Sequence, residues 1–248
     1  MRSSNPTLLS NPFSGFRTVS EPESMTIKGT ANKTLLLLIL VMLPAAWVWK
    51  MFLNAGGNVA TIQIWMMIGI FGGLITSLVT VFKKEWAPLT APLYAVLEGL
   101  FLGGISAIFN HAYPGIVVQA VSLSLATLLA MLITYQSGLI KVTNNFRLGV
   151  VAATGGIAIV YLGSLVLSLF GVNASFIYGS GLFSILFSLF VVGIAALNFI
   201  LDFDFIKQGA RNGAPKYMEW YGAFALMVTL VWLYIELLRL LAKLSDRR

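Results

Sequence analysis

Apolar residues dominate the chain from residue 34 onward, and only short polar connections interrupt them. Seven stretches each approach the ~20 residues that a membrane-spanning helix needs. We place them at residues 34–52, 62–82, 88–109, 116–139, 148–170, 177–206 and 216–241. The connections contain glycine, proline and asparagine, which favour turns. The pattern predicts an all-α, polytopic membrane protein with seven transmembrane helices, whose membrane domain covers residues 34–244.

Residues 1–33 are polar and rich in serine, asparagine, threonine and proline. They lack the short apolar core near the N-terminus that marks a secretory signal. We therefore expect a disordered cytoplasmic extension. A docking role for this extension is the alternative.

Composition supports the membrane class. The chain has 248 residues, of which 58% are hydrophobic and 10% charged, far from the usual quarter charged for a soluble domain. The absence of cysteine excludes disulfides and thiolate metal sites. The net charge of +7 does not indicate nucleic-acid binding, because the basic residues lie between the apolar stretches, as in cytoplasmic loops.

The basic residues predict the orientation. Counted in alternate connections, they gather on one side, against Lys50 alone on the other. They are Arg2, Arg17, Lys28, Lys33, Lys83, Lys84, Lys141, Arg147, Lys207, Arg211 and Lys216. The positive-inside rule then predicts a multi-pass protein of the cell (inner) membrane with a cytoplasmic N-terminus. Seven spans would send the basic C-terminal tail outside, so a half-inserted sixth or seventh segment is the alternative.

Two glycine pairs predict close helix packing. Gly69 and Gly73 lie four residues apart on the second stretch, and Gly99 and Gly103 do so on the third. Small residues at this spacing let two helix backbones approach.

Acidic residues within the apolar stretches are the candidates for function, because a carboxylate near lipid is costly and often marks an ion path. Glu98 lies midway along the third stretch with no basic residue in helical reach. Asp202 closes the sixth and shares a helix face with Asn198. Asp204 points another way, and we expect it to be interfacial with Lys207 as its partner.

Two glutamates lie on the seventh stretch. Glu219 follows a proline and suits the N-terminus of a helix, and it also falls near the depth of Asp202. Glu236 has Arg239 three residues later, which predicts a local ion pair. Both remain candidates to share a site with Asp202.

Enzyme motifs are not evident. Asp202 and Asp204 end an apolar helix rather than lying in a nucleotide-sugar domain, and the single histidine, His111, lies in a loop. It provides neither a catalytic dyad nor a metal cluster. We expect no enzyme activity and no cofactor.

The Glu98-Gly99 step, the Asp202 position and the ending at residues 233–241 resemble the Bax inhibitor-1 family, in its bacterial branch. The resemblance covers about residues 34–244. It implies a seven-helix bundle with the seventh helix central and surrounded by the other six. It also implies a pH-sensitive calcium leak controlled by aspartates on the sixth and seventh helices. Asp202 matches the first. The second position falls either on Glu236 or near Thr229, in which case Glu219 substitutes.

A carboxylate pair would share a proton and, when ionised, would suit calcium. We therefore predict a pH-sensitive cation (calcium) leak channel with protons and calcium as its small partners, the lipid bilayer around it and calcium bound at Asp202. The alternative is a non-conducting membrane regulator that binds a membrane protease or stress-response protein.

Overall fold

The computed structural model describes residues 24–171, 177 and 179–247. Within this part, seven helices are long and apolar enough to cross a membrane, and no strand is formed. The helices are α2 (Ile27–Asn54), α3 (Ala60–Phe82), α4 (Ala87–Ala112), α5 (Ile116–Gln136), α6 (Asn144–Leu169), α8 (Leu182–Arg211) and α9 (Met218–Ser245). The short 3₁₀ helix η2 (Lys84–Trp86) leads into α4. The predicted all-α membrane fold is confirmed.

The first helix begins earlier than the hydrophobic pattern predicts. Thr26 is its N-cap, because its side chain accepts a hydrogen bond from the Gly29 amide. Met25 is buried and donates its amide hydrogen to the Ala214 carbonyl at 2.6 Å. Residues 24–33 are therefore ordered, and the boundary at residue 34 was wrong. The expected disorder of the extension otherwise concerns residues 1–23, which lie outside the described residues.

The sixth span is also displaced relative to the prediction. It runs from Leu182 to Arg211, so the basic residues expected in a turn after residue 206 belong to the helix. Asp202 and Asp204 consequently lie inside α8 rather than at its end. Both α8, with 30 residues, and α9, with 28, are long enough to span a membrane. The lengths give no support to a half-inserted segment.

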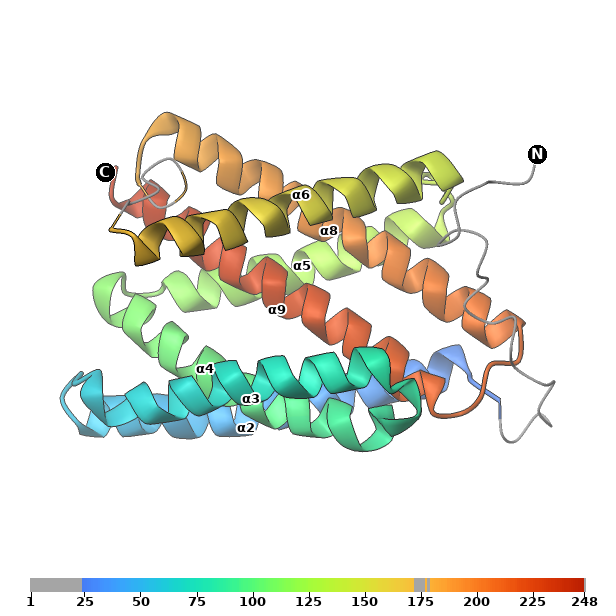
Figure 1. Cartoon of the computed structure of the whole chain (residues 1–248), viewed down its shortest axis with the longest axis horizontal. Helices are drawn as coiled ribbons and strands as arrows, with labels where there is room; N and C mark the ends of the chain where they lie inside the picture. Colours follow the sequence, from blue (N-terminus) through green and yellow to red (C-terminus); the bar gives the residue numbers. More distant parts are fainter. Residues whose placement is uncertain (1–23, 172–176, 178, 248) are drawn as a thin grey trace.

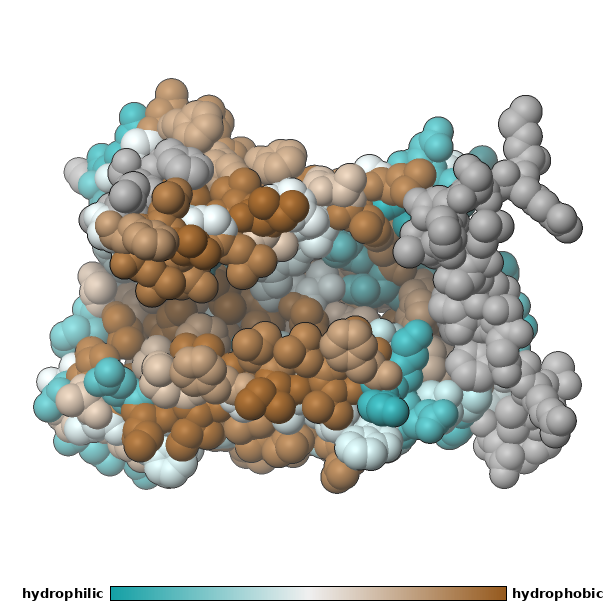
Figure 2. All heavy atoms as spheres, viewed as in Figure 1, coloured by the Kyte–Doolittle hydropathy of each residue, from teal (hydrophilic) through white to brown (hydrophobic). Residues whose placement is uncertain are grey.

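The helix α9 runs through the middle of the bundle (Figure 1). On one side lie α2, α3 and α4, and on the other α5, α6 and α8. It packs against α2, α4, α5 and α8, and most of its length is buried. The central position of the seventh helix is confirmed, but it packs mainly against four helices rather than against all six. The helices α3 and α6 pack mainly on α4 and on α8, respectively, and expose apolar side chains along their length (Figure 2).

The predicted glycine packing is confirmed on both sides of α4. A Cβ atom on Gly69 of α3 would lie 2.7 Å from backbone atoms of Leu97 and Phe101. A Cβ atom on Gly103 of α4 would overlap the backbone of Ala45 in α2. These glycines allow three helix backbones to approach at distances that a side chain would prevent.

The two ends of the bundle differ in which connections they carry. The start of α2 lies at the same end as the connections α3–α4, α5–α6 and α8–α9 (Figure 1). The C-terminus of α9 lies at the opposite end. The basic connections identified in the sequence thus gather at one end, because successive spans alternate in direction.

Candidate ion site

The helices α8 and α9 are joined by two polar contacts in one antiparallel register. Thr229 of α9 donates its hydroxyl hydrogen to Asp202 of α8 at 2.6 Å. Lys243 of α9 contacts Ser188 of α8 at 2.7 Å. The two contacts lie two seven-residue steps apart along both helices, so both fall on the same pair of helix faces.

We call this pair of faces the α8–α9 seam. The same register places Ala195 opposite Glu236, between the two polar contacts. It places Gly209 opposite Gly222, on the far side of the Asp202–Thr229 contact. The seam consists of Ser188, Ala195, Asp202 and Gly209 on α8 and Lys243, Glu236, Thr229 and Gly222 on α9. Every position is small, polar or charged. Such a seam differs from the large apolar side chains that fill most of the surrounding core.

The partner of Asp202 is a hydroxyl rather than a second carboxylate. Neither predicted candidate, Glu219 or Glu236, occupies the opposing position; Thr229 does. The resemblance to the family offered two positions for the second aspartate, Glu236 and the vicinity of Thr229, and the contact falls on Thr229. Asn198 lies one turn before Asp202, but its amide group is directed to α6, where it donates a hydrogen bond to Thr154 at 2.9 Å.

Glu219 is held at the start of α2. Its carboxylate accepts hydrogen bonds from the amide and hydroxyl of Thr26 at 2.9 and 2.8 Å and from the ammonium of Lys33. Lys216 adds an ion pair at 3.3 Å. The side chain is fully buried, and the absence of a Cβ at Gly29 leaves room for it. The expected position in the first turn of α9 is correct, but the contacts to α2 could not be read from spacing.

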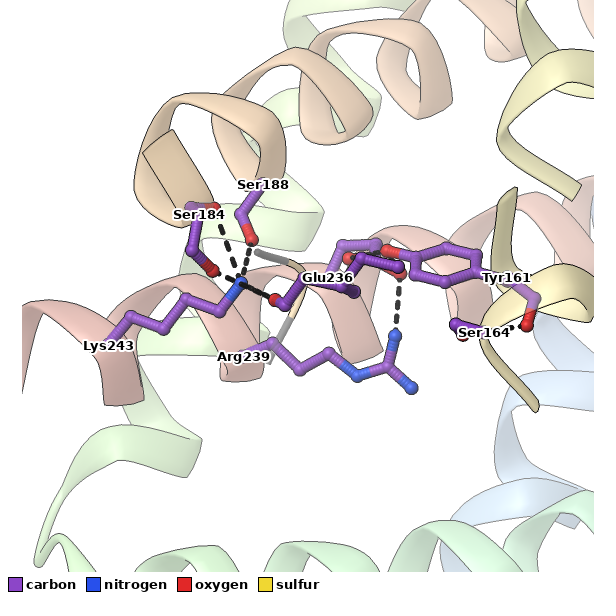
Figure 3. Close-up of polar contacts among 8 residues, drawn as sticks. Tyr161, Ser164, Ser184, Ser188, Glu236, Arg239 and Lys243 are labelled. Atoms are coloured by element: carbon purple, nitrogen blue, oxygen red, sulfur yellow. Dashed lines mark hydrogen bonds and ion pairs between the residues drawn. The ribbon is translucent and has the colours of Figure 1, made fainter. Parts of the chain in front are cut away.

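Glu236 forms the predicted ion pair with Arg239, at 3.0 Å. It also accepts a hydrogen bond from the hydroxyl of Tyr161 on α6 at 2.9 Å, which the sequence did not indicate (Figure 3). The carboxylate is buried while Arg239 is partly exposed. Glu236 therefore has a resident counter-ion, Arg239.

Asp204 points away from the seam, as its spacing predicted, but its partner is not Lys207. The guanidinium of Arg147 on α6 contacts it at 2.9 Å, and Gln208 and Tyr135 donate hydrogen bonds at 2.5 and 3.3 Å. Lys207 instead lies over the ring of Tyr135. Because α8 continues past residue 206, Asp204 meets the start of α6 rather than a local turn.

Glu98 lies between α3 and α4. A Cβ atom on Gly73 of α3 would lie 3.1 Å from its carboxylate, so the glycine provides the space that this side chain occupies. The hydroxyl of Tyr94, one turn away, is its hydrogen-bond partner. The partner is again neutral, which agrees with the lack of a nearby basic residue in the sequence.

A cavity of about 620 Å³ lies between α2, α4, α5 and α9, apart from the seam. Its lining is almost wholly apolar, with the Ser106 and Tyr234 hydroxyls bonded to each other at 2.6 Å on its wall. No carboxylate lines it. The cavity is therefore unsuited to holding a cation.

A protein-family model described as "Bax inhibitor 1 like" matches residues 5–246. The match covers nearly the whole chain. The chain belongs to the Bax inhibitor-1 family. Comparisons with curated proteins and with solved structures find no match.

In this Bax inhibitor-1 family member, the carboxylates of the spans divide by partner. Glu219, Glu236 and Asp204 each form an ion pair with lysine or arginine. In the described part of the chain, Asp202 and Glu98 have hydroxyl partners and no ion pair within 4.0 Å. Only Asp202 of these two lies in the α8–α9 seam. No group of three histidine or acidic side chains surrounds it among the residues described.

Proposed function

We propose that this protein is a pH-sensitive cation leak, with calcium as the cation, in which protons and cations compete for Asp202. The observation that supports the proposal is the Asp202–Thr229 contact in the α8–α9 seam, which leaves a membrane-embedded carboxylate without a basic partner. Membership of the Bax inhibitor-1 family also supports the proposal, because a calcium leak is the activity that the family resemblance implies.

The physical argument rests on the cost of an uncompensated charge. An ionised carboxylate inside a membrane costs about 2.5–3.5 kcal/mol even on insertion scales, and more where it is deeply buried. One hydrogen bond from Thr229 offsets part of this cost. The remainder is removed either by a proton or by a bound cation. Proton binding and cation binding at Asp202 therefore exclude each other.

Calcium suits such a site because it takes hard oxygen ligands. Asp202 supplies a carboxylate and Thr229 a hydroxyl oxygen, and water would complete the shell. A single carboxylate gives weak binding, since affinity rises with the number of charged ligands. Weak binding suits a leak, because a permeating ion must also leave.

Few other titratable groups face Asp202 from the helices packed against α8. Tyr221 of α9 is close enough to interact with its charge. Tyr135 of α5 and Arg147 of α6 are directed to Asp204 instead. The pH response of the seam near Asp202 is thus expected to arise from Asp202 itself.

The substitution Asp202→Asn tests the proposal. It keeps the shape of the side chain and its contact with Thr229 but can neither ionise nor lose a proton. Folding should change little, because no buried charge is created. Calcium flux into proteoliposomes containing only this protein, measured over several pH values, should lose its pH dependence.

Asp204→Asn is the matched control, since the same change is made two residues away at a carboxylate already paired with Arg147. Its flux should keep the wild-type pH profile. Thr229→Asp would create a carboxylate pair and should strengthen the pH dependence, because two like charges at short range share a proton. An unchanged pH profile in Asp202→Asn rules out gating at this residue.

The alternative function is a non-conducting regulator that binds a membrane protein partner. The family match supports this alternative, because the match begins at residue 5 and so includes much of the N-terminal extension. Absence of flux from the purified protein at every pH would favour this function.

In either case we place the N-terminus in the cytoplasm, from the gathering of basic connections at one end.

A further inference from the structure

Lys243 lies in the last turn of α9, at the end of the α8–α9 seam that is remote from the start of α2 (Figure 1), and its side chain is buried. Figure 3 shows its polar contacts. Its ammonium donates to the Ile177 carbonyl at 2.5 Å, to the Ser188 hydroxyl oxygen at 2.7 Å and to the Ser184 carbonyl at 3.3 Å. The Ser184 hydroxyl also bonds to the Ile177 carbonyl, at 2.8 Å, which fixes that oxygen in place.

The shell around this ammonium consists of neutral oxygen atoms. Glu236, the acidic residue one seven-residue step away on α9, contacts Arg239 and Tyr161 instead. In the part of the chain that the structure describes, Lys243 forms no ion pair within 4.0 Å. The direct contacts of this buried positive charge are thus carbonyl and hydroxyl dipoles. Rings and cages of such oxygens are what replace the hydration shell of alkali cations in selective pores.

The position of this shell relates it to Asp202. The Ser188–Lys243 contact lies two seven-residue steps from the Asp202–Thr229 contact, about 21 Å along the helix at 1.5 Å per residue. Between these two contacts the seam contains Ala195, which is small, and Glu236, which is acidic. A cation moving along the seam from Asp202 would therefore arrive at the Lys243 shell.

We propose that the oxygen shell at the first turns of α8 is a binding site for a monovalent alkali cation, which the Lys243 ammonium occupies as a tethered cation, closing this end of the seam. The closing of the seam rests on the proposed leak function; the cation site does not. A purely structural clamp, in which Lys243 only fastens residue 177 to α9, predicts a loss of stability that no cation restores.

Thermal unfolding of the full chain in detergent distinguishes these two roles. Lys243→Ala vacates the shell and leaves its oxygens without the ammonium. In choline chloride it should melt below the wild type. Replacing choline by sodium or potassium at constant ionic strength should raise its melting temperature by about 2–4 °C in a saturable way, the size expected for roughly 1 kcal/mol in a chain of this length.

Lys243→Met and Lys216→Ala are the matched controls. Methionine fills the space of the lysine stem without a charge, so no cation should restore its stability. Lys216 is an exposed lysine preceding the other end of α9, and its loss removes the same charge without vacating a shell. Neither control should respond to the alkali cation. Equal responses in all three variants would mean a general salt effect and overturn the cation site.

A second variant guards against loss of folding in Lys243→Ala. Lys243→Ser is small, and its hydroxyl can hydrogen-bond the vacated carbonyls, so it should show the same cation dependence. Adding Ser188→Ala to either variant removes one shell oxygen and should raise the cation concentration needed for half the effect. Failure of both single variants to fold in every salt, or folding without cation dependence, overturns the site.

Flux measurements test the closure separately. If Lys243 closes the seam, Lys243→Ala should increase sodium or potassium flux in proteoliposomes by at least several-fold over wild type. Cation-dependent melting without increased flux would retain the site and overturn the closure. Loss of pH dependence in Asp202→Asn bears only on the proposed leak, so the two proposals fail independently.

Discussion

The helices on the two sides of α9 are held by different means. On one side, α2, α3 and α4 pack through glycines whose missing side chains let backbones touch. On the other, the glycines of α6 have open space where a Cβ would lie, and polar side chains connect α6 to its neighbours. The first side is fixed by shape at these close backbone contacts. The second is fixed at a few points, and α8, which carries Asp202, belongs to it.

The difference suggests where motion would originate. Close backbone packing gives van der Waals contact that is lost steeply with small displacements. Hydrogen bonds and ion pairs at partly exposed positions are weaker and can be exchanged for water or other partners. If the seam opens, α6 and α8 are the helices expected to move, against a fixed unit formed by α2, α3 and α4.

A large loss of stability is expected from filling a glycine contact. Gly103→Ala places a methyl group into the backbone of Ala45 and should destabilise the protein by about 1–3 kcal/mol, the usual cost of overpacking. Gly156→Ala makes the same change on α6 in open space, and should be neutral or stabilising by up to about 1 kcal/mol. Thermal melting in detergent compares the two. Equal melting temperatures would remove the contrast between the two sides.

A loss of comparable size is expected from placing a positive charge at Glu98, within the glycine-packed side. Glu98→Gln keeps the shape and a neutral hydrogen-bonding group beside Gly73, so it should fold and insert normally. Glu98 lies near the middle of α4, so Glu98→Lys places an unpaired cation there at a cost of about 2.5–3.5 kcal/mol. Yield and melting temperature are the measurements. Similar values for the two variants would show that the carboxylate is not enclosed.

The smallest effect on stability is expected from the polar contacts of α6. Arg147→Gln removes the ion pair with Asp204, and because Arg147 is partly exposed the loss should be about 1 kcal/mol or less. Hydrogen exchange should nevertheless become faster in the first turns of α6. Lys141→Gln, at an exposed lysine in the same connection, is the control. Unchanged exchange in Arg147→Gln would mean that packing, rather than this contact, holds α6 to α8.

The structure also shows how far local spacing predicts the partners of charged residues. The Glu236–Arg239 pair was predictable because both residues lie one turn apart on the same helix. The same reasoning failed at Asp204, where a cation from α6 replaces the expected Lys207. A partner supplied by another helix leaves no periodic signal in the sequence, so local pairs are predicted by default.

The amino-acid sequence by itself determined the number of spans, the glycine contacts and the choice of acidic residues as candidates. These follow from hydrophobic length, residue size and the cost of charge in a membrane, which are local properties. Only the tertiary structure decided which of these carboxylates lack a counter-ion. Lys33 reaches Glu219 and Thr229 reaches Asp202 because α2 and α8 both pack on α9. Those contacts depend on how three helices are arranged in space, which their separate sequences do not specify.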